Sequence, residues 1–122
     1  MKTVCVILAN GCEEVEAITP IDYLRRSGLE VTVAGLGARE VVGGHGIELG
    51  TDAVLDDIDE QDFDCIVVPG GGGGSKDIAA DPTAVELLKR QASKGRLIAD
   101  ICAHPPLVLG QACGIKAGRR LT

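Results

Sequence analysis

The chain of 122 residues carries a formal net charge of −6 and is 45% hydrophobic but only 2% aromatic. This length suits one domain around one core, and the scarcity of aromatic residues predicts that the core is aliphatic. The acidic balance argues against a nucleic-acid partner or an anionic membrane surface, because both require a basic face. No segment approaches the ~20 apolar residues of a membrane-spanning helix.

The first part of the chain predicts a strand, a helix and a second strand. Residues 3–9 form a continuous apolar run, as expected for a strand buried on both faces. This run is too short for the core of a signal peptide, and acidic residues follow it at once, which predicts a cytoplasmic protein. Residues 13–28 place apolar side chains at helical intervals between opening acids and closing arginines. Residues 29–36 predict the second strand.

The middle of the chain is less regular. Residues 47–58 predict a short extended excursion, and the acidic residues 56–64 lack the spacing of a calcium-binding loop, so they are interpreted as a solvated loop. Residues 64–71 predict a third buried strand that ends in a glycine turn. The glycine run continues through Gly72–Gly74, for which a flexible loop is the plain interpretation.

The last predicted elements are a helix and a strand. Residues 81–95 predict a helix with Asp81 at its N-cap, Pro82 in its first turn and Gly95 at its end. Residues 96–102 predict a fourth strand. Strands that alternate with helices specify an open parallel sheet covered on both faces, with ligands bound beyond the carboxyl ends of the strands. The motifs that follow three of the strands, "NGCEEVE", "PGGGGGS" and "CAHPP", are therefore expected to converge.

Neither a metal nor a nucleotide cofactor is predicted. The five cysteines are an odd number without metal-site spacing, and Cys5 and Cys65 are interpreted as small buried hydrophobic residues. The glycine run matches neither the dinucleotide fingerprint nor the phosphate-binding loop. For Gly70 and Gly71, directly at the strand end, a functional turn that points backbone N–H groups at a substrate oxygen is favoured.

Cys102 ends the fourth predicted strand, which is the position of a nucleophile elbow. A helix that begins near Pro105 or Pro106 would place its N-terminus beside the thiol and lower the pKa of Cys102.

Three glutamates open the first predicted helix. Glu13 and Glu14 are interpreted as solvated partners of the helix dipole, whereas Glu16 lies between apolar residues and can turn into the cleft. Desolvation there favours the protonated carboxyl, which can donate a hydrogen bond to sulfur. The spacing alone leaves this role open.

The segments "VILANGCEEVEAITPIDYLRRSGLEVTVAGL", "VVPGG" and "LIADICAHP", in this order and spacing, resemble the ThiJ/PfpI superfamily. The nearest branch is that of the Parkinsonism-associated protein deglycase and its bacterial relatives. The resemblance covers nearly the whole chain and implies a flavodoxin-like three-layer α/β sandwich with a mostly parallel sheet, a homodimer, and no metal or organic cofactor. Residues 1–122 are then a single domain that corresponds to about the N-terminal two-thirds of the family fold, so C-terminal elements are expected to be lacking after Thr122.

The resemblance also assigns site residues. Cys102 matches the reactive elbow cysteine, and Glu16 matches the carboxylic acid that hydrogen-bonds to it. Gly70 and Gly71, with the N–H of Ala103, match the backbone oxyanion site.

Two histidines have weaker assignments. His45 falls near a family position that lines the rim of the pocket on the dimer side. His104 stands where the family usually has a small residue, and it is interpreted as a rim or helix-start histidine in preference to a base. The peptidase-like branch has histidine at the position of Ala103, so this chain departs from that branch.

The leading hypothesis is a cysteine-dependent, cofactor-independent enzyme that acts on small reactive carbonyls or glycated substrates, of the glyoxalase III or deglycase type. Cys102 would attack the aldehyde, Glu16 would move the proton, and the backbone N–H groups would hold the oxygen. The alternative is an oxidative-stress sensor or redox-regulated chaperone that uses the same cysteine. A weaker alternative is a cysteine peptidase or amidotransferase-like hydrolase.

Overall fold

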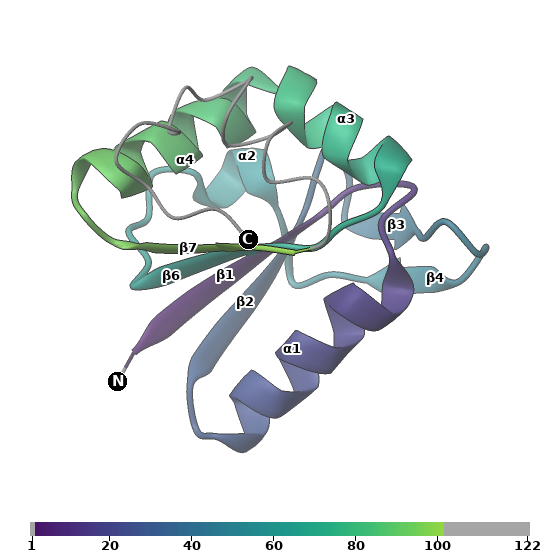
Figure 1. Cartoon of the computed structure of the whole chain (residues 1–122), viewed down its shortest axis with the longest axis horizontal. Helices are drawn as coiled ribbons and strands as arrows, with labels where there is room; N and C mark the ends of the chain where they lie inside the picture. The colour runs from purple at the N-terminus through teal and green to yellow at the C-terminus, as the bar shows by residue number, and fades with distance from the viewer. Residues whose placement is uncertain (1, 102–122) are drawn as a thin grey trace.

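Within residues 2–101, the fold is built on a central sheet of five parallel strands (Figure 1). A computed structural model describes residues 2–101, apart from the side chains at positions 72 and 75. The strand order is β5-β2-β1-β6-β7. The strands are β1 (Thr3–Leu8), β2 (Glu30–Gly35), β5 (Ala53–Val54), β6 (Cys65–Val68) and β7 (Leu97–Asp100). Four of them lie within the four predicted strand segments, which confirms the expected parallel α/β sheet.

Helices cover both faces of this sheet, which gives three layers (Figure 1). Helix α1 (Glu14–Arg26) packs on one face through Ala17. Helices α2 (Leu55–Ile58), α3 (Gly72–Ala80) and α4 (Pro82–Ser93) pack on the other. The architecture is therefore the flavodoxin-like sandwich that the sequence predicts.

Strand β1 lies in the middle of the sheet and contributes to both cores. Its side chains alternate, so Val6 packs with the α1 layer while Cys5 and Ile7 pack with the α2–α4 layer. This arrangement confirms the prediction of a strand buried on both faces and of a buried Cys5. Cys65, which begins β6, is only partly buried.

A two-stranded antiparallel hairpin was not predicted. It consists of β3 (Glu40–Val42) and β4 (Glu48–Gly50), and it lies beside the carboxyl end of β1. The extended excursion expected over residues 47–58 is correct for β4 and β5 but wrong at its end, where α2 forms. This helix forms because Leu55 and Ile58, one turn apart, are both buried against the sheet.

The loop interpretation of Gly72–Gly74 is also wrong, since these glycines form the first turn of α3. Their lack of side chains lets the helix approach the loop after β1: a Cβ added at Gly74 would lie 3.1 Å from the backbone N of Cys12. Tertiary contact thus overrides the low helix propensity of glycine. The next helix follows prediction, with the Asp81 carboxylate accepting from the Ala84 N–H at 3.0 Å.

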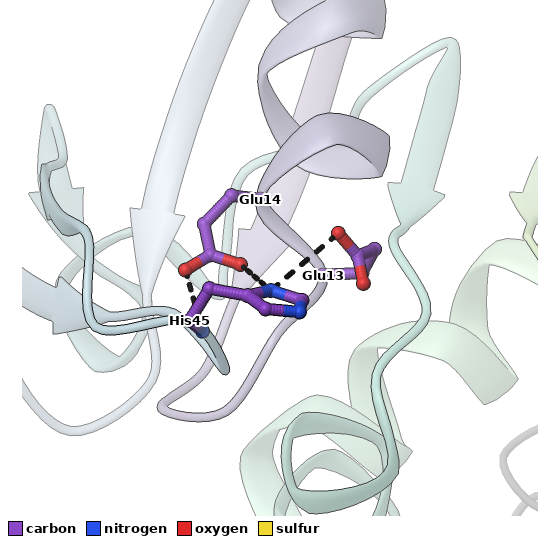
Figure 2. A group of neighbouring side chains, drawn as sticks. All are labelled: Glu13, Glu14 and His45. Carbon is purple, nitrogen blue, oxygen red and sulfur yellow. Dashed lines mark hydrogen bonds and ion pairs between the residues drawn. The ribbon is translucent and has the colours of Figure 1, made fainter.

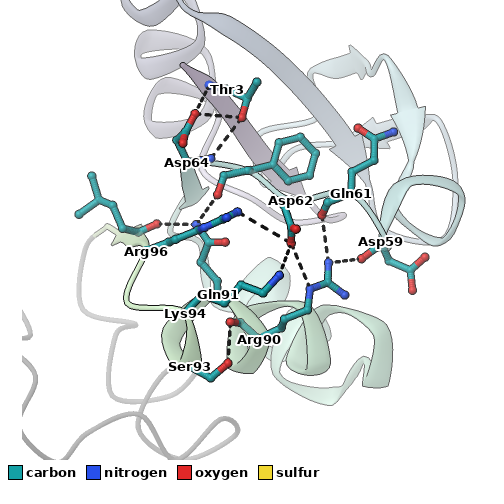
Figure 3. A network of polar contacts seen from close by, with 12 residues as sticks. Thr3, Asp59, Gln61, Asp62, Asp64, Arg90, Gln91, Ser93, Lys94 and Arg96 are labelled. Atoms are coloured by element: carbon teal, nitrogen blue, oxygen red, sulfur yellow. Dashed lines mark hydrogen bonds and ion pairs between the residues drawn. The ribbon is translucent and has the colours of Figure 1, made fainter. Parts of the chain in front are cut away.

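The acidic segment before β6 is anchored at the amino edge of the sheet, away from the predicted site (Figure 3). Asp62 faces three cations from α4 and the turn after it, at 2.9 Å from Lys94 Nζ, 3.6 Å from Arg90 and 3.9 Å from Arg96. The side chain of Gln91 donates to the carbonyl of Phe63 at 3.0 Å. This segment is therefore a structural link between α4 and the sheet.

None of the helices within residues 2–101 is long and apolar enough to cross a membrane.

Candidate active site

Two of the predicted strand-end motifs lie in contact at the carboxyl edge of the sheet. The loop after β1 reaches the loop after β6, where the Glu13 N–H donates to the Gly70 carbonyl at 2.9 Å. The third motif, with Cys102, Ala103 and His104, lies outside the described residues. The chain enters that motif from the carboxyl end of β7, whose neighbour in the sheet is β6.

Gly71 fixes how closely these two loops approach. Its φ of +110° is a conformation that side-chain-bearing residues rarely adopt. An added Cβ would also lie 2.6 Å from the Gly11 carbonyl oxygen and 2.7 Å from the Glu13 nitrogen, both backbone atoms that cannot rotate away. Position 71 therefore requires glycine for packing, independently of any role in catalysis.

Glu16 points from the first turn of α1 toward the end of β6. Its Oε1 accepts a hydrogen bond of 3.0 Å from the Gly70 N–H. The sequence predicts that Glu16 and Gly70 belong to one site, and the structure places them in direct contact; their chemical roles stay predictions. A protonated carboxyl can accept this bond through one oxygen and donate through the other.

Glu14 is buried, so its interpretation as a solvated residue is wrong (Figure 2). The side chain is only 4% exposed, because the segment between β3 and β4 folds over it. Its carboxylate accepts from the His45 N–H at 2.8 Å, from His45 Nδ1 at 2.9 Å and from the Ile47 N–H at 3.3 Å. Periodicity could not reveal this burial, since the hairpin that causes it was not predicted.

The contact between Glu14 and His45 shifts both pKa values. The hydrogen bond from His45 is the main cause that lowers the pKa of Glu14 to about 2. The same bond, with the charge of Glu13 at 3.9 Å, raises the pKa of His45. His45 therefore joins the hairpin segment to the start of the helix that carries Glu16, while its side chain stays 69% exposed.

Glu13, Glu14 and His45 also form a group whose potential metal-ligand atoms lie within 4.8 Å of one another. The ring nitrogen Nδ1 of His45 is already hydrogen-bonded to the Glu14 carboxylate. The arrangement is accounted for as an ion pair that anchors the hairpin segment.

Asp100, at the carboxyl end of β7, is a buried acid that the sequence analysis missed. It ends β7 opposite Val68 in β6, and both of its carboxyl oxygens are buried without a hydrogen-bond partner among residues 2–101. Burial raises the pKa of Asp100 to about 7. The signal was visible in the sequence, since an acid interrupts the apolar run "LIADIC".

The parallel five-stranded sheet and the contacts at its carboxyl edge define a flavodoxin-like α/β protein. Residues 2–122 match the DJ-1/PfpI family, and the chain belongs to this family.

Relatives of known description agree with this assignment. The chain is 43% identical to a glutathione-independent glyoxalase of Caenorhabditis elegans over 97% of its own length and 62% of the relative. It is 32% identical to a deglycase of Pyrococcus abyssi, over 98% of the chain and 70% of the relative. The solved structure of oxidized DJ-1 from Toxoplasma gondii superimposes with a TM-score of 0.92 at 35% identity, covering 97% of this chain and 64% of that one. The chain thus spans less than two thirds of the nematode and Toxoplasma proteins.

Proposed function

We propose that this chain forms the nucleophile-bearing part of a cysteine-dependent, cofactor-independent enzyme that acts on small reactive carbonyls such as methylglyoxal. The observation that carries the proposal is the contact between Glu16 and Gly70, which brings a carboxyl and a strand-end backbone N–H together at the edge where the chain leads to Cys102. The names of two relatives, a glyoxalase and a deglycase, point to the same chemistry.

In the proposed reaction, the Cys102 thiolate attacks the aldehyde carbon, forming a C–S bond as the C=O π bond opens to an alkoxide. Glu16 gives its proton to this oxygen, which yields a hemithioacetal. The carboxylate then takes the hydrogen from the former aldehyde carbon and delivers it to the neighbouring carbon through an enediol. Water cleaves the resulting thioester, so methylglyoxal and water give lactate and the free thiol without an external oxidant or reductant.

The backbone donors have a defined part in this scheme. The Gly70 N–H holds the Glu16 carboxyl before substrate binds. When an alkoxide forms, the proposed donors to it are the N–H groups of Gly70, Gly71 and Ala103. Binding of the oxygen at Gly70 requires the Glu16 side chain to turn away, which frees the carboxyl to work on the substrate.

A homodimer is part of the proposal. Apolar side chains are exposed on α1 and on the adjoining hairpin, among them Val15 at 69%, Ile18 at 46% and Ile47 at 50%. Exposed apolar side chains such as these support a surface that a second copy covers. The cytoplasmic location predicted from the sequence is likewise a proposal.

The test is lactate formation from methylglyoxal by the purified protein and by Cys102→Ala, with Cys65→Ala as the matched control. Cys65 lies at the amino end of β6, away from the proposed site. We expect Cys102→Ala to abolish lactate formation and the control to retain it. Glu16→Gln should lower the rate by about 10²-fold or more. Lactate formation that survives Cys102→Ala would contradict the proposed function.

An oxidation sensor is the second candidate, because the Toxoplasma relative is described in an oxidized form. In that case peroxide would oxidise the Cys102 thiolate to sulfenic acid and then to sulfinic acid, each step reducing one peroxide. The sensor predicts that Glu16→Gln changes the yield of sulfinic acid while lactate formation is absent in the unmodified chain. Peptide mass spectrometry of the oxidised residue, run beside the lactate assay, distinguishes the two functions.

A further inference from the structure

Gly70 is bound by the start of α1 through both of its backbone polar groups. Its carbonyl accepts a hydrogen bond of 2.9 Å from the Glu13 N–H, and its own N–H donates to Glu16 Oε1 at 3.0 Å. Glu13 is the N-cap of α1, so its N–H has no acceptor within the helix and can bind another segment. The loop after β6 is therefore attached to α1 at the point where the strand ends.

The bond to the Gly70 carbonyl sets the direction of the next N–H group. The peptide between Gly70 and Gly71 is trans, and the C=O and N–H of a trans peptide point in opposite directions. Because the carbonyl points at Glu13, the Gly71 N–H points away from the start of α1. Among the described atoms of residues 2–101, this N–H has no acceptor. The Gly70 N–H is already used by Glu16, so the Gly71 N–H is the donor that is available before any side chain moves.

The two glycines do not set this direction by themselves. A peptide between two glycines has no side chain beside it, so its rotation meets little steric resistance. The φ of +110° at Gly71 is one of the several values that glycine adopts readily. The hydrogen bond from Glu13 therefore supplies a restraint that side chains would provide elsewhere in the chain.

Glu13 is held in place independently of this bond. The loop that precedes it is attached to the hairpin, where the Gly11 N–H donates to the Val42 carbonyl at 2.8 Å. The Cys12 carbonyl in turn accepts from the Gly44 N–H at 2.8 Å. Loss of the one bond between Glu13 and the loop after β6 would thus leave the loop after β1 anchored.

We propose that Glu13 is a positioning residue that acts through its backbone N–H and not through its carboxylate: it holds the peptide between Gly70 and Gly71 so that the Gly71 N–H is presented to an oxygen of the substrate. This inference deepens the proposed function and rests on it for the identity of the acceptor. An oxygen that gains negative charge is stabilised most by a donor that is already oriented and needs no reorganisation. Glu13 itself does not contact the substrate.

The experiment compares the unmodified chain with Glu13→Pro, with Glu13→Ala and with a backbone ester at residue 13. Proline has no N–H, and the φ of −79° at Glu13 lies within the range of proline. Glu13→Ala keeps the N–H and removes the carboxylate. The ester replaces the N–H by oxygen and keeps the glutamate side chain, so it separates the loss of the donor from any effect of the proline ring on Cys12.

The first readout does not depend on catalysis. Residual dipolar couplings, measured by NMR, report the direction of the Gly71 N–H bond within the folded domain. We expect the Gly71 coupling to be the same in the unmodified chain and in Glu13→Ala, and to change in Glu13→Pro and in the ester. The couplings of sheet amides such as Val6 and Val33 should stay in place. An unchanged Gly71 coupling in both variants that lack the N–H would overturn the proposal, and so would a change that extends through the sheet.

The second readout is the rate of lactate formation from methylglyoxal. A donor that binds an oxygen as its charge develops affects kcat more than KM. We expect Glu13→Pro and the ester to lower kcat by about 10-fold or more with little change in KM, while Glu13→Ala retains most of its kcat. An undiminished kcat in both variants that lack the N–H would overturn the proposal. Absence of lactate in the unmodified chain would contradict the proposed function instead, and the Gly71 couplings then decide this inference alone.

Discussion

Glu14 and Asp100 are two carboxyl groups with little access to water that lie near the same edge of the sheet, yet their pKa values move in opposite directions. The pKa of Glu14 falls to about 2, while that of Asp100 rises to about 7. Glu14 has three hydrogen-bond donors from the hairpin segment. The buried oxygens of Asp100 have no well-aligned donor among residues 2–101, and burial outweighs the small lowering effect of the Ile101 N–H on its pKa. Burial alone favours the neutral acid and raises its pKa. Hydrogen-bond donors that face the carboxylate favour the charged form and lower the pKa.

The largest effect on stability is expected when Glu14 loses its charge. Glu14→Gln removes the negative charge that the three donors face, and its amide can accept through only one oxygen, so the charged imidazole of His45 loses its acceptor. We expect the Tm to fall by several degrees at pH 7, measured by thermal denaturation. Because the folded pKa of Glu14 is depressed, its stabilisation is present above pH 4.5 and is lost as the pH falls toward about 2. The difference between the two proteins should therefore shrink toward pH 2.

The matched control is Glu13→Gln. Glu13 carries the same charge in the same helix start, but its carboxylate lies 3.9 Å from His45 Nδ1 and is more exposed. Equal losses of Tm from Glu13→Gln and Glu14→Gln would show that net charge at the helix start, and not the buried hydrogen bonds, stabilises this region.

Much of the fold was accessible from the sequence because its signals are local. The apolar run of β1 and the capped helix α4 could be read from hydrophobic pattern and capping residues. The hairpin could not be predicted in this way, because β3 and β4 have only three residues each and are too short to show an alternating hydrophobic pattern. Helix α3 begins in glycines, and only contact with the loop around Cys12 explains why they are helical.

The residues of the candidate site also fall into those that the sequence could predict and those that it could not. Glu16 and Gly70 each follow a predicted strand, so the rule that ligands bind at the carboxyl edge brought them together in the prediction. Glu14 was misjudged because its burial depends on the unpredicted hairpin. A Cβ at Gly43 would collide with the Glu14 carboxyl group, so glycine is needed there for the segment to close over it. Such a requirement becomes visible only in three dimensions.

For Asp100, the raised pKa predicts that the stability of the fold depends on pH. The folded pKa of Asp100, about 7, lies above its ordinary 3.8, so the folded state holds more protons than the unfolded chain between these values. Stability therefore falls as the pH rises through this window. Relative to Asp100→Asn, the unmodified chain should lose on the order of 1 to 2 kcal/mol between pH 4 and pH 8, after allowing for solvent screening. Urea denaturation at both pH values measures the difference, and parallel losses in the two proteins would contradict the raised pKa.

The smallest expected effect concerns His45, the partner of Glu14. Its pKa is raised, so the charged imidazole stabilises the hairpin segment below the ordinary value of 6.5 and releases it as the pH rises through the folded pKa. NMR titration of the imidazole should give a pKa above 6.5, lowered more by Glu14→Gln than by Glu13→Gln, because the hydrogen bond exceeds the charge as a cause. The side chain is largely exposed, so salt should weaken the contribution of Glu13 more than that of the Glu14 hydrogen bond. Equal shifts from the two glutamates would mean that His45 senses only the summed charge of the helix start.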